Sequence, residues 1–279
     1  MTPLAFLTYP DINPVAIEYG PISIKWYGLA YLTGLVLGWI YVRRLVTTPR
    51  LWFADKPPLT LEQVDDLLLY MTGAVIIGGR LGQVFLYDPD FYFSHPAEIV
   101  KVWKGGMSFH GALIASGLLL LLFARQFKVS ARSVMDLCCA ASPVGIFFGR
   151  IANFINSEHW GRVTTSSIGM VFPNGGPEPR YPSQLFEAVL EGLVMWFIIR
   201  FATHKMLGLK RPGLVTGIWL IWYAIARSLC EIFREPEAYN IFNIGPFTAG
   251  QVYCLPMLLI GVYLVWLARR PEASGKVSA

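Results

Sequence analysis

The densest group of polar side chains lies in residues 149–162, which read GRIANFINSEHWGR. In a helix, Arg150, Asn153 and Ser157 share one face because they are spaced at i, i+3 and i+7. The run begins inside a strongly apolar segment. A guanidinium there suits bidentate recognition of a phosphate, with the side-chain amides of Asn153 and Asn156 as further donors. The alternative is a polar helix end that only anchors the segment, but an anchor does not need an arginine one turn inside it.

A second motif, GGMSFHGA at residues 105–112, places His110 about one turn inside the start of another apolar segment. Histidine is the usual general base near neutral pH, and the glycines around it allow a close approach of the backbone. A single histidine near the end of an apolar segment is more often structural. Both interpretations of His110 therefore stay open at this point.

Two further arginines stand in polar motifs within apolar surroundings. Arg80 is the centre of a GGRLG motif and has no acidic residue three or four positions away on the same helix. Arg234 belongs to RSLCEIFREP, residues 227–236, in which Arg227, Glu231 and Arg234 fall on one helix face. Because Arg227 and Glu231 are spaced at i, i+4, a simple structural pair along the helix is the alternative for these two.

The composition explains the setting of these motifs. Hydrophobic residues make up 54% of the 279 residues and charged residues only 15%, where about 25% is usual, and the mean hydropathy is +0.49. A soluble globule with so few charges cannot cover its surface, and a disordered chain is far more polar. We therefore expect an all-α integral membrane protein.

The charge distribution and the motifs present argue against nucleic-acid binding and against metal or cofactor chemistry. The net charge of +5 is not organised into a basic stripe with interleaved aromatic residues, so we expect no nucleic acid as a partner. No nucleotide-binding loop, zinc motif or carboxylate cage is present in the sequence, and we expect no cofactor and no metal. Four cysteines in apolar runs match no zinc or disulfide spacing and are expected to be small buried side chains: Cys138, Cys139, Cys230 and Cys254.

Seven apolar segments are long enough to cross the hydrocarbon core of a bilayer, which takes about 20 residues as a helix. We predict them at 24–42, 66–87, 107–124, 133–152, 184–199, 213–233 and 248–268. Together they predict a single polytopic membrane domain over residues 1–279.

Basic residues are distributed unevenly over the connections between these segments. Fourteen of the 23 lie after the first, third and fifth segments or in the C-terminal tail, and six lie on the opposite side. This excess predicts an N-terminus outside and a C-terminus in the cytoplasm. The remaining three, Arg80, Arg150 and Arg227, fall inside apolar segments, where an arginine needs a partner or a wet cavity. Candidate acidic partners at similar depth are Asp136, Glu187, Glu191 and Glu231.

The predicted topology brings the polar motifs to one side of the membrane. The longest connection, about residues 153–183, is rich in proline and glycine and predicts an extracytoplasmic cap. Near the outer half of the membrane lie His110, Arg150, Arg234 and Tyr27. Tyr27, in the WYG motif that starts the first segment, belongs either to this site or to an aromatic belt. An imidazole beside two or three arginines describes a site for an anionic phospholipid headgroup with acid–base chemistry.

Six motifs, in this order and over nearly the whole chain, resemble those of the phosphatidylglycerol–prolipoprotein diacylglyceryl transferases. They are WYG at Trp26, GGRLG at Gly78, GGMSFHG at Gly105, GRIANFINSEHWG at Gly149, YPSQLFE at Tyr181 and EIFREP at Glu231. The run at Gly149 is close to the family signature. One departure is Ala112, where many members have a second glycine after the histidine, and it concerns loop packing rather than chemistry.

The resemblance implies a seven-helix, multi-pass enzyme of the bacterial cell inner membrane. Such an enzyme transfers the sn-1,2-diacylglyceryl group of phosphatidylglycerol to the lipobox cysteine of a prolipoprotein signal peptide and releases glycerol 1-phosphate, the first step of lipoprotein maturation. Its partners are phosphatidylglycerol, prolipoproteins and membrane lipids. By the same resemblance, Arg150 and Arg234 match the essential arginines and His110 the essential histidine. Other sensitive positions match Tyr27, Asn153, Glu158 and Gly161, and we expect Arg80 and Asn156 to join them in binding phosphatidylglycerol.

The residues suit this chemistry by their own properties. A thiolate is a far better nucleophile than a thiol, and His110 can take the thiol proton directly or through a water molecule. The alternative is that His110 only positions the lipid. Attack at the glyceryl carbon breaks a C–O bond and gathers charge on the leaving phosphate, which Arg150 and Arg234 can stabilise.

The alternative function is a lipid or anion transporter, because arginines at membrane depth also line substrate paths. The sequence shows no paired inverted repeat and no matching broken helices in two halves, which disfavours that class. A structural membrane scaffold does not need charged groups concentrated at one face.

Overall fold

The computed structural model describes residues 7–10, 12–19, 22–102, 105–235 and 248–270. Lys104 and Lys276, two of the 23 basic residues counted above, and Pro236, the last residue of the motif at 227–236, lie outside these ranges. The described residues divide into a larger unit, which holds those up to residue 42 and those from 136 to 270, and a smaller unit, which holds those from 43 to 135.

In the larger unit, an antiparallel hairpin of β1 (Val15–Tyr19) and β2 (Ile22–Lys25) leads directly into α1 (Trp26–Val46). The hairpin is a departure from the all-α expectation. Its two strands are short and run directly into a long apolar helix, so the sequence pattern does not distinguish them from that apolar segment. The other helical elements are α5 (Ala131–Ile155), α6 (Ser183–Glu187), a π-helical stretch (Ala188–Val194), α7 (Met195–His204), a 3₁₀ turn (Gly208–Lys210), α8 (Leu214–Cys230) and α9 (Ala249–Ala268).

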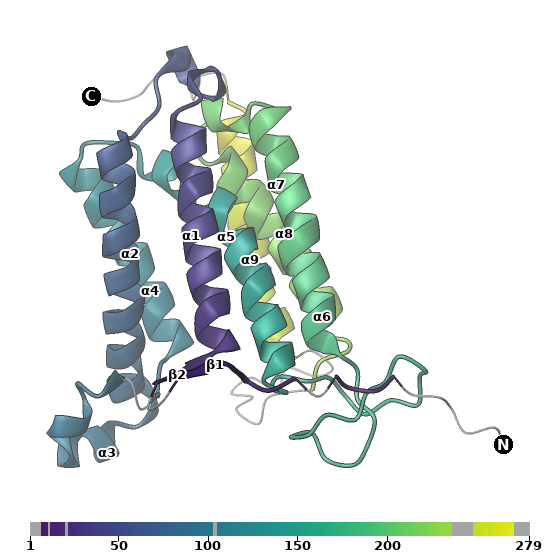
Figure 1. Cartoon of the computed structure of the whole chain (residues 1–279). Helices are drawn as coiled ribbons and strands as arrows, with labels where there is room; N and C mark the ends of the chain where they lie inside the picture. Colours follow the sequence, from purple (N-terminus) through teal and green to yellow (C-terminus); the bar gives the residue numbers. More distant parts are fainter. Residues whose placement is uncertain (1–6, 11, 20–21, 103–104, 236–247, 271–279) are drawn as a thin grey trace. The chain divides into compact units, whose positions relative to one another are not determined.

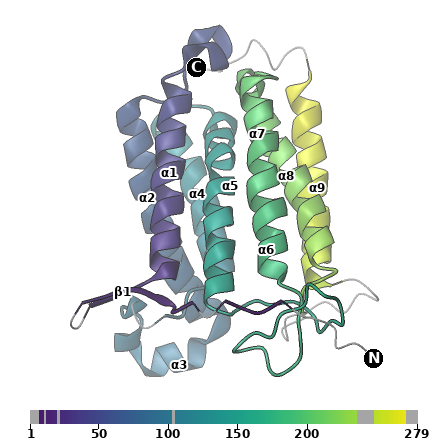
Figure 2. The same cartoon turned by 45° about the vertical axis from the view of Figure 1, so that its right-hand side comes forward.

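Small residues bring the helices of the larger unit together. α8 and α9 lie side by side (Figure 2), and Gly217 of α8 faces Gly261 of α9. A Cβ atom on Gly217 would lie 2.8 Å from the carbonyl oxygen of Gly261, so only glycine allows the two backbones this close. Such contacts are typical of helices that pack inside a membrane, where apolar side chains gain nothing by leaving the lipid.

A buried carboxylate joins α5 to the start of α8. Asp136 accepts hydrogen bonds from the backbone N–H groups of Gly213 and Thr216, both at 2.7 Å, and from the Thr216 hydroxyl at 2.6 Å. These groups belong to the first turn of α8, where unpaired N–H groups favour an anion. Asp136, which the sequence analysis considered as a partner for an arginine, thus fixes the N-terminus of a helix.

The smaller unit is built around α2 (Leu61–Gly82) and α4 (Phe109–Gln126), which lie side by side (Figure 1). α2 starts with a capping box in which Thr60 and Gln63 bond each other's backbone N–H group. The remaining elements are 3₁₀ turns at Pro49–Leu51, Phe53–Asp55 and Pro96–Glu98, a π-helical stretch at Gln83–Tyr87, and α3 (Pro89–Ser94).

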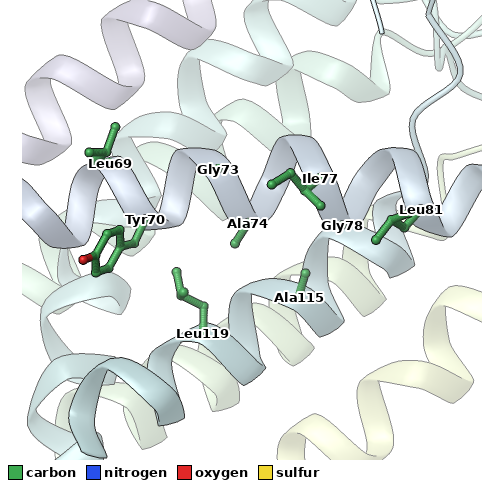
Figure 3. Close-up of a pocket in the computed structure, with 9 residues that line it drawn as sticks. All are labelled: Leu69, Tyr70, Gly73, Ala74, Ile77, Gly78, Leu81, Ala115 and Leu119. Carbon is green, nitrogen blue, oxygen red and sulfur yellow. The ribbon is translucent and has the colours of Figure 1, made fainter. Parts of the chain in front are cut away.

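An apolar groove of about 550 Å³ lies along α2 and α4 (Figure 3). Small residues, including Gly73, Ala74 and Ala115, leave the space, and Leu69, Ile77 and other apolar side chains line it. None of the site residues predicted from the sequence lines this groove.

Among the described residues, four helices are long and apolar enough to cross a membrane: Trp26–Val46, Leu61–Tyr87, Ala131–Ile155 and Gly250–Ala268. Two shorter apolar helices, His110–Gln126 and Leu214–Cys230, coincide with the predicted segments 107–124 and 213–233. The predicted segment 184–199 lies within the helical stretch formed by α6, the π-helical turns and α7. The helical character expected from the sequence is confirmed.

The loop after α5 is folded around a hydrophobic cluster of its own. Phe154, Met170 and Phe172 are buried together, with Tyr9 and Trp160 packed against them. Single β-bridges join Val163 to Arg180, Met170 to Arg180, Met170 to Leu7, and Gly161 to Arg234. The last bridge matters for the site, because it connects this loop to the segment that follows α8.

Candidate active site

Six charged side chains of the larger unit form one network, which we call the Arg–Glu cluster. Four helical elements and the turn after α8 contribute to it. Its members are Arg150 of α5, Glu187 of α6, Glu191 of the π-helical stretch, Arg227 of α8, and Glu231 and Arg234 after α8.

Glu187 is the centre of the cluster, since its carboxylate contacts all three arginines. Its Oε2 atom lies 2.9 Å from Nε of Arg150, and its Oε1 atom lies 3.2 Å from Nη1 of Arg227 and 3.0 Å from Nη1 of Arg234. The side chain of Glu187 is fully buried. One carboxylate thus sets the positions of three guanidinium groups that come from different parts of the sequence.

The other two glutamates complete the pairing. Arg150 Nη2 donates to Glu191 at 3.1 Å, and Arg227 lies 3.7 Å from the same carboxylate. Arg227 Nη2 donates to Glu231 at 2.6 Å, which is the i, i+4 pair expected from the sequence. Arg227 is therefore more than a local pair, because it also joins the carboxylates of the neighbouring helical segment.

The cluster is formally neutral, with three positive and three negative charges. Burying charge at membrane depth is tolerable only when every charge is paired in this way. The exposed fraction of the side chain is 20% for Arg150 and 15% for Arg227 but zero for Glu187 and Glu191. The side chains of Arg150 and Arg227 are thus the partly accessible members of the cluster, whereas Arg234, with 7% of its side chain exposed, is buried with the carboxylates.

The end of α5 carries a second polar group. Asn153 donates to the Glu158 carboxylate at 2.9 Å, and Asn156 donates to the same oxygen at 3.3 Å. Gln184 of α6 donates to the backbone carbonyl of Glu158 at 2.7 Å. The two amides expected to face a phosphate are therefore engaged by Glu158, and they fix this residue at the end of the helix.

Gly161 lies where the loop meets the segment after α8. Its N–H group donates to the Tyr181 carbonyl at 2.9 Å, and a Cβ atom there would lie 2.7 Å from that same oxygen. The next residue, Arg162, donates from its backbone to Phe233 at 2.8 Å and from its side chain to the carbonyl of Arg234 at 2.9 Å. Gly161 therefore allows the backbone packing that positions Arg234.

Tyr27 lies in the first turn of α1, where its hydroxyl and that of Tyr31 are 3.0 Å apart. It is half-buried and belongs to the same unit as the Arg–Glu cluster. His110 and Arg80 belong to the smaller unit. His110 is exposed in the first turn of α4, and its Nδ1 atom lies 2.9 Å from the Tyr87 hydroxyl. Arg80 is buried, and its guanidinium donates to backbone carbonyl groups.

From the sequence, Glu187 and Glu191 were expected only as candidate acidic partners of an arginine, with no role of their own. Their signal is visible in the sequence, as two acids four residues apart inside an apolar segment. The π-helical turns that carry Glu191 are a rare local structure that often occurs at functional sites. In the described part of the chain, no group of three or more His, Cys, Asp or Glu side chains is placed to hold a metal ion.

Comparison with known proteins adds an independent finding. The family described as Prolipoprotein diacylglyceryl transferase matches residues 14–267. A phosphatidylglycerol–prolipoprotein diacylglyceryl transferase of Beijerinckia indica is 50% identical over 269 residues, which covers 95% of this chain and 97% of that protein. The protein of the same name from Rhizobium meliloti is 43% identical over 274 residues, 98% of each chain, and that of Rickettsia felis is 45% identical over 259 residues, 93% and 98%.

Proposed function

The chain belongs to the prolipoprotein diacylglyceryl transferase family, and from this premise we propose how its residues carry out the reaction. It is a membrane transferase that moves a diacylglyceryl group from phosphatidylglycerol to a prolipoprotein, the first step of lipoprotein lipidation. In the proposed reaction, the acceptor is the lipobox cysteine thiol, glycerol 1-phosphate leaves, and no cofactor takes part.

The observation that carries the residue assignment is the Arg–Glu cluster. An incoming anion meets the partly exposed side chains of Arg150 and Arg227 before it meets the buried carboxylates or the buried Arg234. Within the part of the chain that the structure describes, Arg150 Nη1 has no hydrogen-bond partner, so it is available to a ligand. In the proposal, Arg150 and Arg234 bind the phosphate of phosphatidylglycerol, with Arg227 held beside them.

The carboxylates explain why this arrangement suits catalysis. Glu187 and Glu191 hold the guanidinium groups in place before the substrate arrives, so little reorganisation is needed as charge develops on the leaving phosphate. Donors preorganised in this way act most strongly in a site that excludes water. Removing one such donor typically costs about 2.7–4 kcal/mol of transition-state stabilisation, which sets the scale for each arginine.

The proposed role of His110 is to take the proton of the cysteine thiol. The sulfur then attacks the glyceryl carbon that bears the phosphate ester, a C–S bond forms, and the C–O bond to the phosphate breaks. The electron pair leaves with glycerol 1-phosphate, and the imidazolium returns its proton to the leaving group or to water. The Tyr87 hydroxyl, 2.9 Å from Nδ1, orients the ring.

The polar group at the end of α5 suits the glycerol headgroup of the lipid. Glu158 accepts hydrogen bonds from Asn153 and Asn156. The amides can donate to the hydroxyl groups of a glycerol headgroup, and the carboxylate can accept from them. In the proposal this group and the Tyr27 hydroxyl bind the headgroup, and Gly161 acts through the backbone packing that positions Arg234.

The proposal includes a topology. All seven apolar segments cross the inner membrane of a bacterium, the N-terminus lies outside, and the C-terminus lies in the cytoplasm. The distribution of basic residues supports this orientation. The folded loop at residues 156–182 then covers the outer end of the helices, where a prolipoprotein presents its cysteine.

The test is an assay with purified protein, phosphatidylglycerol vesicles and a synthetic lipobox peptide. The expected result is a gain of one diacylglyceryl group by the peptide without any nucleotide, together with release of glycerol phosphate. A peptide with serine in place of the cysteine is the control and should gain no mass. Movement of lipid between leaflets without any modified peptide would favour the transporter and contradict the proposal.

A further inference from the structure

Arg80 is almost completely buried in the smaller unit, with 5% of its surface exposed. Its guanidinium donates to the backbone carbonyls of Ile99 at 2.8 Å, Gly105 at 2.6 Å and Gly106 at 2.9 Å, and also to that of Glu98. A guanidinium has five N–H groups, and all three of its nitrogens are engaged here. Arg80 therefore has little capacity left for the binding of phosphatidylglycerol that was expected from the sequence.

Tyr92, Gly105 and Gly106 surround the guanidinium of Arg80. Tyr92 lies under the group, with 4.8 Å between the guanidinium carbon and the ring centre. Gly105 and Gly106 have φ angles of 87° and 76°, which turn both carbonyls toward the arginine. A Cβ atom on Gly106 would lie 3.0 Å from Arg80 Nη1 and 3.1 Å from the Tyr92 hydroxyl, so the turn fits closely around the side chain.

The same turn leads directly into the helix that carries His110. The N–H group of Ser108 donates to the carbonyl of Gly79, next to Arg80, at 2.8 Å. The Ser108 hydroxyl caps α4 by accepting from the N–H group of Gly111 at 3.1 Å. Gly111 in turn packs against Gly82 in the last turn of α2. The first turn of α4 is thus fastened to the last turn of α2 on both sides of Arg80.

His110 and its partner Tyr87 lie on the two helices that this turn connects. Tyr87 ends the π-helical continuation of α2, and His110 lies in the first turn of α4. Their side chains are 2.9 Å apart, and the turn around Arg80 connects the two helices that carry them. We propose that Arg80 is a positioning residue that holds His110 against Tyr87 and does not bind the lipid phosphate. This inference rests on the proposed function of His110.

The first test compares Arg80→Lys with Gly106→Ala, which disturbs the same turn from the opposite side and leaves the guanidinium in place. A lysine carries one nitrogen and cannot serve carbonyls on two sides. Because a displacement of about 1 Å can cost about 10²-fold, both variants should lower kcat by about 10–100-fold. The KM for phosphatidylglycerol should change by less than about twofold. Arg150→Lys serves as the control in which a phosphate contact is changed directly.

The second test is a double-mutant cycle with His110→Asn. If Arg80 acts through His110, then Arg80→Lys should cost less than about twofold in protein that already carries His110→Asn. The kcat losses are measured per folded molecule, with the melting temperature of each variant, since a merely structural role lowers stability and not the kcat of folded protein. Full additivity, or a raised KM with unchanged kcat in Arg80→Lys alone, would overturn the inference. An unchanged rate in His110→Asn itself would instead contradict the proposed function.

Discussion

Replacing Glu187 by glutamine should damage both the stability and the activity of this transferase. The change keeps the size of the side chain and removes the charge that three arginines share. One oxygen still accepts from Arg227 and Arg234, but the new amide group presents N–H donors toward Nε of Arg150, where the carboxylate oxygen lay at 2.9 Å. Arg150 loses the negative charge that pairs with its Nε, and the buried cluster carries a net charge of +1.

The expected loss of stability follows from the burial of the Glu187 side chain. Glu187 is fully buried, and removing one partner of a buried ion pair costs about 3–5 kcal/mol. For a chain of this size that corresponds to a fall in Tm on the order of 10 °C. Because Arg150 is no longer held for the phosphate, kcat/KM should fall by about 10²–10³-fold, the usual effect of losing one preorganised donor.

Two matched variants make this prediction specific. Glu191→Gln removes a carboxylate that contacts two arginines, at 3.1 Å and 3.7 Å, and should cost less than Glu187→Gln in both measurements. Glu235→Gln breaks the ion pair with Arg180 at a side chain that is 44% exposed, and it should change stability by less than about 1 kcal/mol. The assays are peptide modification with phosphatidylglycerol and thermal unfolding in the same detergent. A Glu187→Gln protein with the wild-type Tm and rate would refute the reasoning that this carboxylate positions the arginines.

Three further predictions concern the site and the topology. Arg150→Lys keeps the charge but loses the planar fork, so folded protein should lose at least about 2–3 kcal/mol of transition-state stabilisation, and near-normal turnover would remove Arg150 from the phosphate site. His110→Asn should lower activity by about 10²–10⁴-fold, and a pH–rate profile should show the loss shrinking toward high pH, where solvent ionises the thiol; a loss that is flat with pH in a stable variant would leave lipid positioning as its role. A single cysteine placed at Arg269 should react with an impermeant reagent only from the cytoplasmic side, and labelling from outside would reverse the orientation.

Local spacing predicted part of the site well. The i, i+4 relation of Arg227 and Glu231 is present as a 2.6 Å ion pair, and the helical run through Arg150 and Asn153 is part of α5. These features depend only on the geometry of a single helix. The helical character of the apolar segments likewise follows from the need to satisfy backbone hydrogen bonds in lipid.

Other features depend on contacts between distant parts of the chain, and the sequence alone does not reveal them. Glu187 contacts arginines 37, 40 and 47 positions away, and the choice of partner depends on how helices pack. Asn153 was expected to face a phosphate, but the turn after α5 brings Glu158 back to its amide. The partners of Arg80 are backbone carbonyls, which leave no side-chain signal in the sequence.

The order of charges along the chain has a consequence for how the protein is made. From the N-terminus, the cluster reads Arg150, Glu187, Glu191, Arg227, Glu231 and Arg234. As each residue emerges from the ribosome, the running charge of the cluster is therefore +1, 0, −1, 0, −1 and 0. A growing chain never has more than one unmatched charge of this cluster to place in the bilayer, and one arginine or acid in a helix is within what membrane insertion tolerates, at about 2.5–3.5 kcal/mol. Counted by segment, the cluster charge is +1 with Arg150, −1 once both glutamates of α6 and the π-helical stretch are present, and 0 with Arg227, Glu231 and Arg234, so each later segment reverses or cancels the charge before it.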